Sequence, residues 1–127
     1  MDTSEQKRLV MAYVEAYNRF DVEAMLAPLH DDVEFSNCSN GKVNLETKGK
    51  ENFRQQAEQA LPYFSQREQR ITNWTAADNQ LEFTIDFTGV AAIVFPNGLK
   101  LGDTLRLQGK SIFQFRDGRI SSIEDIS

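Results

Sequence analysis

The chain has 127 residues, of which 40% are hydrophobic and 26% charged, a composition typical of a globular protein with a core rather than of a disordered one. Fourteen Lys and Arg against nineteen Asp and Glu give a net charge of -5, and the lack of a basic run argues against nucleic acid as a partner. The sequence lacks the apolar run of a signal peptide or membrane span, and its lone Cys38 suits a reducing compartment. We therefore expect a single cytoplasmic domain over residues 1–127, without a membrane partner.

The N-terminal segment predicts two helices. Thr3 or Ser4 is expected to cap the first, whose apolar residues recur at helical spacing: Leu9, Tyr13, Ala16, Tyr17 and Phe20. Tyr13 and Tyr17 should therefore point inward together. Asp21 suits the N-cap of a short second helix over residues 22–27.

A hairpin and a third helix follow. Residues 31–36 alternate like a strand in which Phe35 faces inward, and Asn37 shares that face by parity. A polar turn over residues 37–41 leads to a short strand over residues 43–48. Gly49 opens a helix over residues 51–61, with Phe53 on its apolar stripe.

The remainder of the chain predicts an antiparallel meander. Four strand-like segments cover residues 67–76, 81–94, 99–115 and 119–126, and the last two are joined by an Asp-Gly hairpin signal. Gly89 and Gly109 are expected bulge or bend positions that curl the sheet. Helices on one side of a bent, mixed sheet indicate an α+β cone that is open at its wide end.

The sequence resembles the NTF2-like superfamily, and within it the SnoaL-like and ketosteroid-isomerase-like branch. The resemblance covers nearly the whole chain and rests on the order and spacing of four segments: YVEAYNRFD at 13–21, LHDDVEF at 29–35, GKENF at 49–53 and FQFRDGRI at 113–120. It implies a cystatin-like curved sheet wrapped on three N-terminal helices. It also implies a pocket for a small hydrophobic molecule and chemistry without a cofactor.

Ketosteroid isomerases use a carboxylate base together with a tyrosine and a protonated aspartic acid that stabilise the enolate oxygen. The resemblance places Tyr13 at the tyrosine, Asn37 at the base and Ser111 at the aspartic acid. An amide cannot take up a proton at neutral pH, so steroid isomerisation by this route is not expected. Asp125 is the alternative acid, because it shares strand parity with Ile123, and burial in an apolar cone would raise its pKa. A solvated acid near the end of the sequence is the competing interpretation.

The catalytic candidates are therefore Tyr13, Asn37 and Asp125. The expected ligand-binding residues are mainly aromatic: Tyr13, Tyr17, Phe35, Asn37, Phe53, Phe87, Ser111 and Phe113. Two functions fit this set equally: an isomerase, cyclase or dehydratase acting on a hydrophobic carbonyl compound, or a non-catalytic binding module for such a ligand. An assembly domain is the third hypothesis, since relatives dimerise through the outer sheet face, and we expect a homodimer of that kind.

Other reactive residue types favour structural roles. His30 lies at a helix end, Asp31 and Asp32 lie in a turn, and Cys38 has no basic neighbour nearby in sequence that would lower its pKa. No cluster of His, Cys or carboxylates has the spacing of metal ligands, and no phosphate-binding loop is present. We therefore expect no metal and no cofactor.

Overall fold

The computed structural model describes residues 1–127 and contains three α-helices and six strands. In chain order the elements are α1 (Thr3–Asn18), α2 (Val22–Leu26), β1 (Leu29–Ser39), β2 (Lys42–Lys48), α3 (Lys50–Ala60), the 3₁₀ helix η1 (Leu61–Tyr63), β3 (Phe64–Ala77), β4 (Gln80–Ala91), β5 (Thr104–Arg116) and β6 (Arg119–Ile126). The predicted α+β class is confirmed. No helix is both long enough and apolar enough to cross a membrane.

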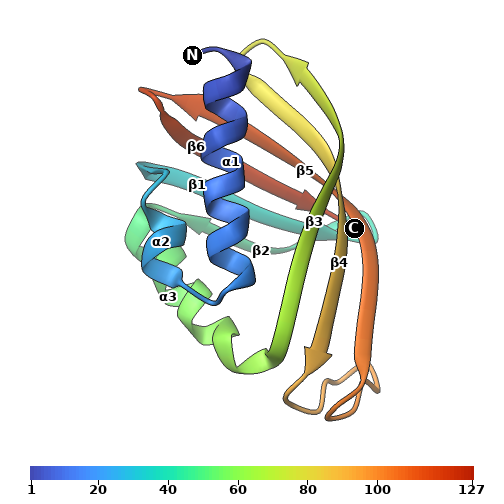
Figure 1. Cartoon of the computed structure of the whole chain (residues 1–127). Helices are drawn as coiled ribbons and strands as arrows, with labels where there is room; N and C mark the ends of the chain where they lie inside the picture. The colour runs from blue at the N-terminus through green and yellow to red at the C-terminus, as the bar shows by residue number, and fades with distance from the viewer.

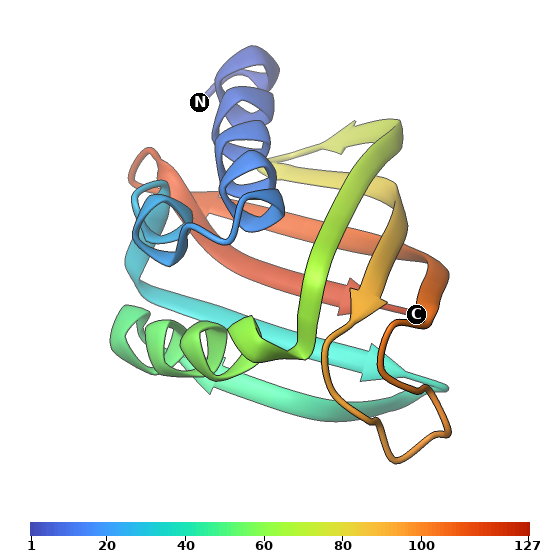
Figure 2. The ribbon, with the colours of Figure 1, turned by 60° about the horizontal axis from the view of Figure 1, so that its bottom comes forward.

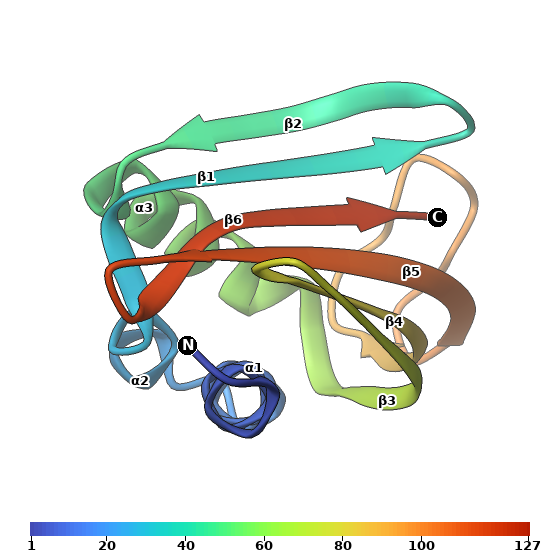
Figure 3. The ribbon, with the colours of Figure 1, turned by 90° about the horizontal axis from the view of Figure 1, so that it is seen from above.

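The six strands form one mixed sheet in the order β2-β1-β6-β5-β4-β3. The predicted antiparallel meander is present as β3 to β6, whereas β6 pairs in parallel with β1. Figure 1 shows the helices on one side of this sheet, and Figure 3 shows the sheet curling so that β3 and β4 turn toward α1. The concave face of the sheet is therefore the face that the helices cover.

Local residue chemistry explains where the helices begin. Asp2, not the expected Thr3 or Ser4, caps α1, because its carboxylate accepts a hydrogen bond from the backbone N–H of Glu5 at 2.8 Å. Asp21 caps α2 as predicted, through the N–H of Ala24 at 3.1 Å. Gly49 precedes α3 with φ of 89°, a conformation that side chains with a Cβ rarely adopt.

The core lies between the concave face and the helices (Figure 2). Four phenylalanines are almost completely buried there: Phe53, Phe83, Phe113 and Phe115. The ring of Tyr13 packs edge-on against Phe113, with centroids 5.6 Å apart, and Phe113 packs in turn on Phe83 at 5.2 Å. These contacts fix α1 on the sheet and orient the Tyr13 side chain.

Several predicted boundaries differ from the structure. Asn37 belongs to β1, which continues to Ser39, so the turn is confined to Asn40 and Gly41 rather than spanning residues 37–41. Residues 99–103, predicted as strand, lie in the β4–β5 loop, where the N–H of Phe95 donates to the Leu99 carbonyl at 2.9 Å. This local turn uses the backbone groups that a strand ladder would need.

Gly89 and Gly109 are not bulges. The pairing of β4 with β5 runs without a shift from Gln80 opposite Gln114 to Val90 opposite Thr104. Instead, each glycine permits a close approach: a Cβ at Gly89 would lie 2.7 Å from the Phe64 ring, and one at Gly109 would lie 2.7 Å from the Ile126 carbonyl oxygen. The register shifts occur elsewhere, for example between Asn37 and Cys38 in β1.

Candidate functional site

Two adjoining pockets lie between the helices and the concave face. The first, of about 250 Å³, is lined mainly by α1, α3, β1 and β3, with Asp125 of β6, and is called here the helix pocket. The second, of about 260 Å³, is lined mainly by β4, β5 and β6 and is called the sheet pocket. The residues shared by both are Tyr17, Asn37, Phe64, Gln69 and Asp125. Together the pockets form one cavity with aromatic walls and few polar groups.

Three polar residues lie side by side across the floor of the cavity. Asn37 on β1 pairs with Asp125 on β6, and Asp125 pairs with Ser111 on β5. Because directly paired residues project from the same face of a sheet, all three side chains lie on the concave face. Strand parity thus brings together three residues that are far apart in the sequence.

Asp125 has an unusual environment for a carboxylate. It is half-buried, and Ser111 donates a hydrogen bond from Oγ to its Oδ1 at 2.6 Å. Removal from bulk water raises the pKa of Asp125 to about 6, and the Ser111 hydrogen bond offsets part of that rise. No basic side chain pairs with it. The group is therefore ionised at neutral pH but basic for a carboxylate, as a proton acceptor should be.

Tyr13 supplies a free hydroxyl to the helix pocket. Its side chain is buried, and its hydroxyl makes no hydrogen bond within the chain. Burial, and secondarily the charge of Asp125, raises the pKa of Tyr13 well above its ordinary value. The phenol therefore stays protonated over the whole physiological range and is available to donate a hydrogen bond to a ligand.

Asn37 lines both pockets but is not paired with Tyr13. Its side-chain amide donates to Oδ1 of Asn44, the neighbour across the β1–β2 hairpin, at 2.9 Å. This contact orients the amide so that its oxygen is left without a partner in the chain.

The other predicted ligand-binding residues divide between wall and core. Tyr17, Phe35 and Phe53 line the helix pocket, and Phe87 and Ser111 line the sheet pocket. Phe113 lines neither pocket, because it lies beneath the Tyr13 ring in the core. The prediction that it faces inward holds, but its contact is with Tyr13 rather than with the cavity.

Arg67 is a cavity residue that sequence reasoning missed. Its side chain is only 7% exposed, and its guanidinium lies 3.8 Å from the centroid of the Tyr17 ring. Burial raises the pKa of Tyr17, whereas the nearby guanidinium lowers it, and the first effect is larger. An arginine at the start of a predicted strand is usually exposed, so the sequence offered no reason to predict that Arg67 is buried in the cavity.

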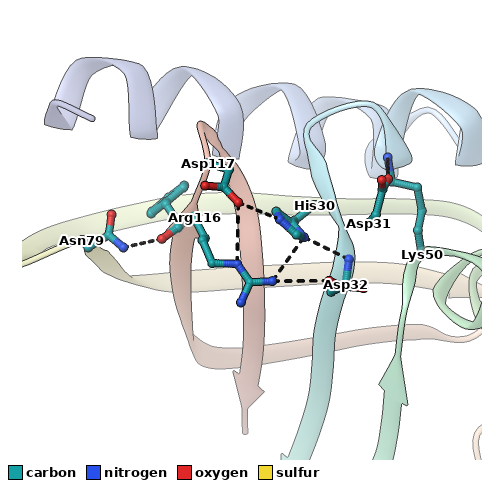
Figure 4. Close-up of polar contacts among 8 residues, drawn as sticks. His30, Asp31, Asp32, Lys50, Asn79, Arg116 and Asp117 are labelled. Carbon is teal, nitrogen blue, oxygen red and sulfur yellow. Dashed lines mark hydrogen bonds and ion pairs between the residues drawn. The ribbon is translucent and has the colours of Figure 1, made fainter.

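His30, Asp31 and Asp32 lie outside the cavity, in a polar cluster at the start of β1 (Figure 4). The His30 Nδ1 accepts from the Asp32 backbone N–H at 3.0 Å, so Nε2 carries the proton that is shared with Asp117 at 3.2 Å. Figure 4 also shows Asp31 paired with Lys50 and Asp32 paired with Arg116, both at 3.6 Å. The contacts of Asp117 and Arg116 tie the β5–β6 turn to β1, and the Asp31–Lys50 pair ties β1 to α3.

A larger groove of about 500 Å³ lies on the opposite, outer face of the sheet. Its side chains are mostly charged or polar, among them Glu34, Glu46, Lys48, Gln114 and Glu124. It contains no buried titratable group. We place the candidate site in the cavity because that is where apolar walls, Asp125 and the free Tyr13 hydroxyl meet.

Comparison with known proteins agrees with this architecture. The model of the SnoaL-like domain family matches residues 10–123, which is most of the chain. The chain belongs to the SnoaL-like domain family. This SnoaL-like protein is thereby placed in a small-molecule-binding family. No curated protein matches its sequence.

Solved structures share the fold of this SnoaL-like protein over nearly its full length. A candidate polyketide cyclase from Xanthomonas campestris pv. campestris is 28% identical with a TM-score of 0.80, over 98% of this chain and 90% of that one. An uncharacterized cystatin-fold protein from Novosphingobium aromaticivorans is 21% identical with a TM-score of 0.75, over 94% and 96%. An epoxide hydrolase of the LEH-like type from M. tuberculosis is 18% identical with a TM-score of 0.76, over 98% and 83%. The last two similarities show the fold alone.

Proposed function

We propose that this SnoaL-like protein catalyses proton transfer on a small hydrophobic carbonyl compound without a cofactor, as an isomerase, cyclase or lyase does. The observation that carries the proposal is Asp125, whose pKa of about 6 lies close to neutrality and whose side chain lines the same cavity as the free Tyr13 hydroxyl. Asn37, an amide, holds the position at which ketosteroid isomerases have their base. Asp125 takes that role here.

The proposed step needs only groups of this chain and the substrate. The ionised Asp125 carboxylate removes a proton from the carbon next to the carbonyl, and the electron pair of that C–H bond moves to the carbonyl oxygen to form an enolate. The Tyr13 hydroxyl donates a hydrogen bond to this oxygen, where negative charge develops. The enolate then takes the proton back at another carbon, attacks an electrophilic carbon, or expels a leaving group.

A binding module for a hydrophobic ligand is the second candidate. The observation in its favour is the aromatic wall of the helix pocket, in which the Phe53 ring packs edge-on against Phe35 and is tilted against Tyr13. Such a wall holds an apolar ligand whether or not chemistry follows. The two candidates differ only in whether Asp125 moves a proton.

Deuterium exchange separates them. We expect the protein to accelerate exchange of deuterium from D₂O into the carbon positions next to the carbonyl of 2-tetralone, followed by proton NMR. The rate should rise as the pH passes through about 6, because Asp125 accepts a proton only when ionised, and should then stay level because Tyr13 remains protonated. If the protein binds 2-tetralone without accelerating deuterium exchange, the result favours the binding module.

Tyr13→Phe tests the hydrogen bond to the carbonyl. Removing the hydroxyl should weaken binding of 2-acetylnaphthalene by about 1 kcal/mol, because a buried carbonyl oxygen loses its donor. Naphthalene, which has no acceptor, should bind both proteins equally in the same NMR titration. If 2-acetylnaphthalene also binds both equally, Tyr13 does not contact the carbonyl.

We also propose that the outer face of the sheet pairs with a second copy of the chain. Ile112 lines the outer groove among polar neighbours, while Glu82 and Asp86 on that face already pair with Lys110 and Arg70 at 3.5 and 3.3 Å. Light scattering should give about twice 14.5 kDa, and Ile112→Asp should halve the mass by placing a charge in the contact. A wild-type mass of 14.5 kDa contradicts the homodimer.

A further inference from the structure

Arg67 is a buried cation without an anionic partner. Arg67 is only 7% exposed, and no carboxylate lies within ion-pair distance of its guanidinium. Asp125 is the one acid of the cavity lining, and it bonds to Ser111 rather than to Arg67. A guanidinium that lines a pocket and has no carboxylate partner is available to an anionic ligand.

Packing holds the guanidinium in place without satisfying it. Its plane lies between the rings of Tyr17, at 3.8 Å, and Phe20, at 4.4 Å, and its Nε–H donates to the Tyr17 carbonyl at 2.9 Å. No carboxylate pairs with the two terminal nitrogens, whose protein neighbour is the Tyr17 side chain. The hydrogen bond from Nε anchors the end of α1. The four N–H groups of the two terminal nitrogens form the planar fork that can bind a ligand.

The location makes that fork part of the candidate site. Arg67 lines the helix pocket together with Tyr13, Tyr17 and Asp125. The guanidinium is near enough to the two tyrosines to affect the pKa of each, whereas Asp125 forms no ion pair with it. The pocket thus contains both a cation, Arg67, and a proton acceptor, Asp125, that do not pair with each other.

We propose that the ligand is a hydrophobic carbonyl compound that also carries a carboxylate, and that Arg67 binds this carboxylate through its two terminal nitrogens. The inference rests on the proposed function of the cavity and adds the class of the substrate. A carboxylate matches the planar fork of arginine with two parallel hydrogen bonds. When the carboxylate of the ligand binds Arg67, its negative charge does not contact Asp125. The carbonyl group of the same ligand then lies beside Tyr13 and Asp125.

Paired probes test the inference on the whole protein. The dissociation constants of 2-naphthoate and methyl 2-naphthoate, measured by calorimetry at pH 7.5, should differ by about tenfold or more in favour of the carboxylate. Arg67→Met should remove this preference by weakening the carboxylate alone. Arg67→Lys should keep part of it, since the charge remains while the fork is lost.

The outcomes separate the two proposals. Equal affinity for acid and ester in the wild-type protein, or an acid preference that survives in Arg67→Met, overturns the role of Arg67. If Arg67→Met does not fold, Arg67→Lys supplies the test, because an acid preference as large as that of the wild-type protein would overturn the role of the Arg67 fork. Deuterium exchange into 2-tetralone, which has no carboxylate, does not depend on Arg67: exchange without acid preference overturns only this inference, and acid preference without exchange overturns only the proposed catalysis.

Discussion

Asp125→Asn is expected to lower the rate of deuterium exchange into 2-tetralone by about 100-fold or more, because it removes the group that accepts the proton. The substitution nearly preserves shape, and the amide oxygen can still accept the Ser111 hydrogen bond that spans 2.6 Å in the wild-type protein. The cavity should therefore keep its form and still bind 2-tetralone. Exchange rates and binding are measured in parallel by NMR.

The same variant should gain stability while it loses activity. The folded-state pKa of Asp125, about 6, lies above the ordinary value of 3.8, so the folded protein holds this proton more tightly than the unfolded chain does. Stability from this group is fully present below pH 4 and is lost as the pH rises through 6. Asp125→Asn should thus be more stable than the wild type by about 3 kcal/mol at pH 8 and nearly equal to it below pH 4, in urea unfolding.

Asp117→Asn is the matched control. Asp117 is an exposed acid in the β5–β6 turn, outside the cavity, so its loss should leave the exchange rate unchanged. A wild-type exchange rate in Asp125→Asn would show that Asp125 is not the base. If Asp125→Asn is less stable than the wild type at pH 8, burial does not disfavour the ionised carboxylate of Asp125.

Phe113→Ala should have the largest effect on folding. Phe113 is 2% exposed and lies between Phe83 and the Tyr13 ring, so truncation leaves a cavity where the first helix meets the sheet. A loss of about 3–5 kcal/mol in the free energy of unfolding is expected. Val94→Ala, at a 71% exposed position, should change it by less than about 0.5 kcal/mol in the same urea titration.

A change of less than 1 kcal/mol for Phe113→Ala would mean that α1 does not depend on this contact. Ligand binding offers a second measurement. Because Phe113 supports Tyr13 without lining the cavity, Phe113→Leu should fold and yet bind 2-acetylnaphthalene more weakly than the wild type does. This distinguishes support of the tyrosine from contact with the ligand.

Strand alternation carried most of the information about the fold and part of the information about the cavity. Asn37 and Asp125 could be assigned to the inner face by parity, because a strand repeats every two residues whatever its partners are. Their pairing with each other could not be predicted, because it depends on the parallel contact between β1 and β6. No local pattern specifies which distant strand lies alongside another.

Arg67 shows where sequence reasoning ends. Its burial depends on the rings of Tyr17 and Phe20, which reach it only because α1 crosses the sheet near β3. The cap of α1 was also misassigned, because Asp2, Thr3 and Ser4 are all good capping residues and the choice among them depends on backbone angles. Both cases involve a side chain whose role is decided by tertiary position rather than by residue type.

The parallel contact of β1 with β6 also bears on how fast the protein folds. Phe35 of β1 pairs with Ile123 of β6, so this contact joins distant parts of the sequence, while β3, β4, β5 and β6 each pair with the next strand along the chain. Closing so long a loop is entropically costly, and folds rich in such contacts form slowly, in roughly milliseconds to seconds. We therefore expect Asp125 and Ser111 to pair early, within the β5–β6 hairpin, and Asn37 to join them late, when β1 docks on β6 and completes the floor of the cavity.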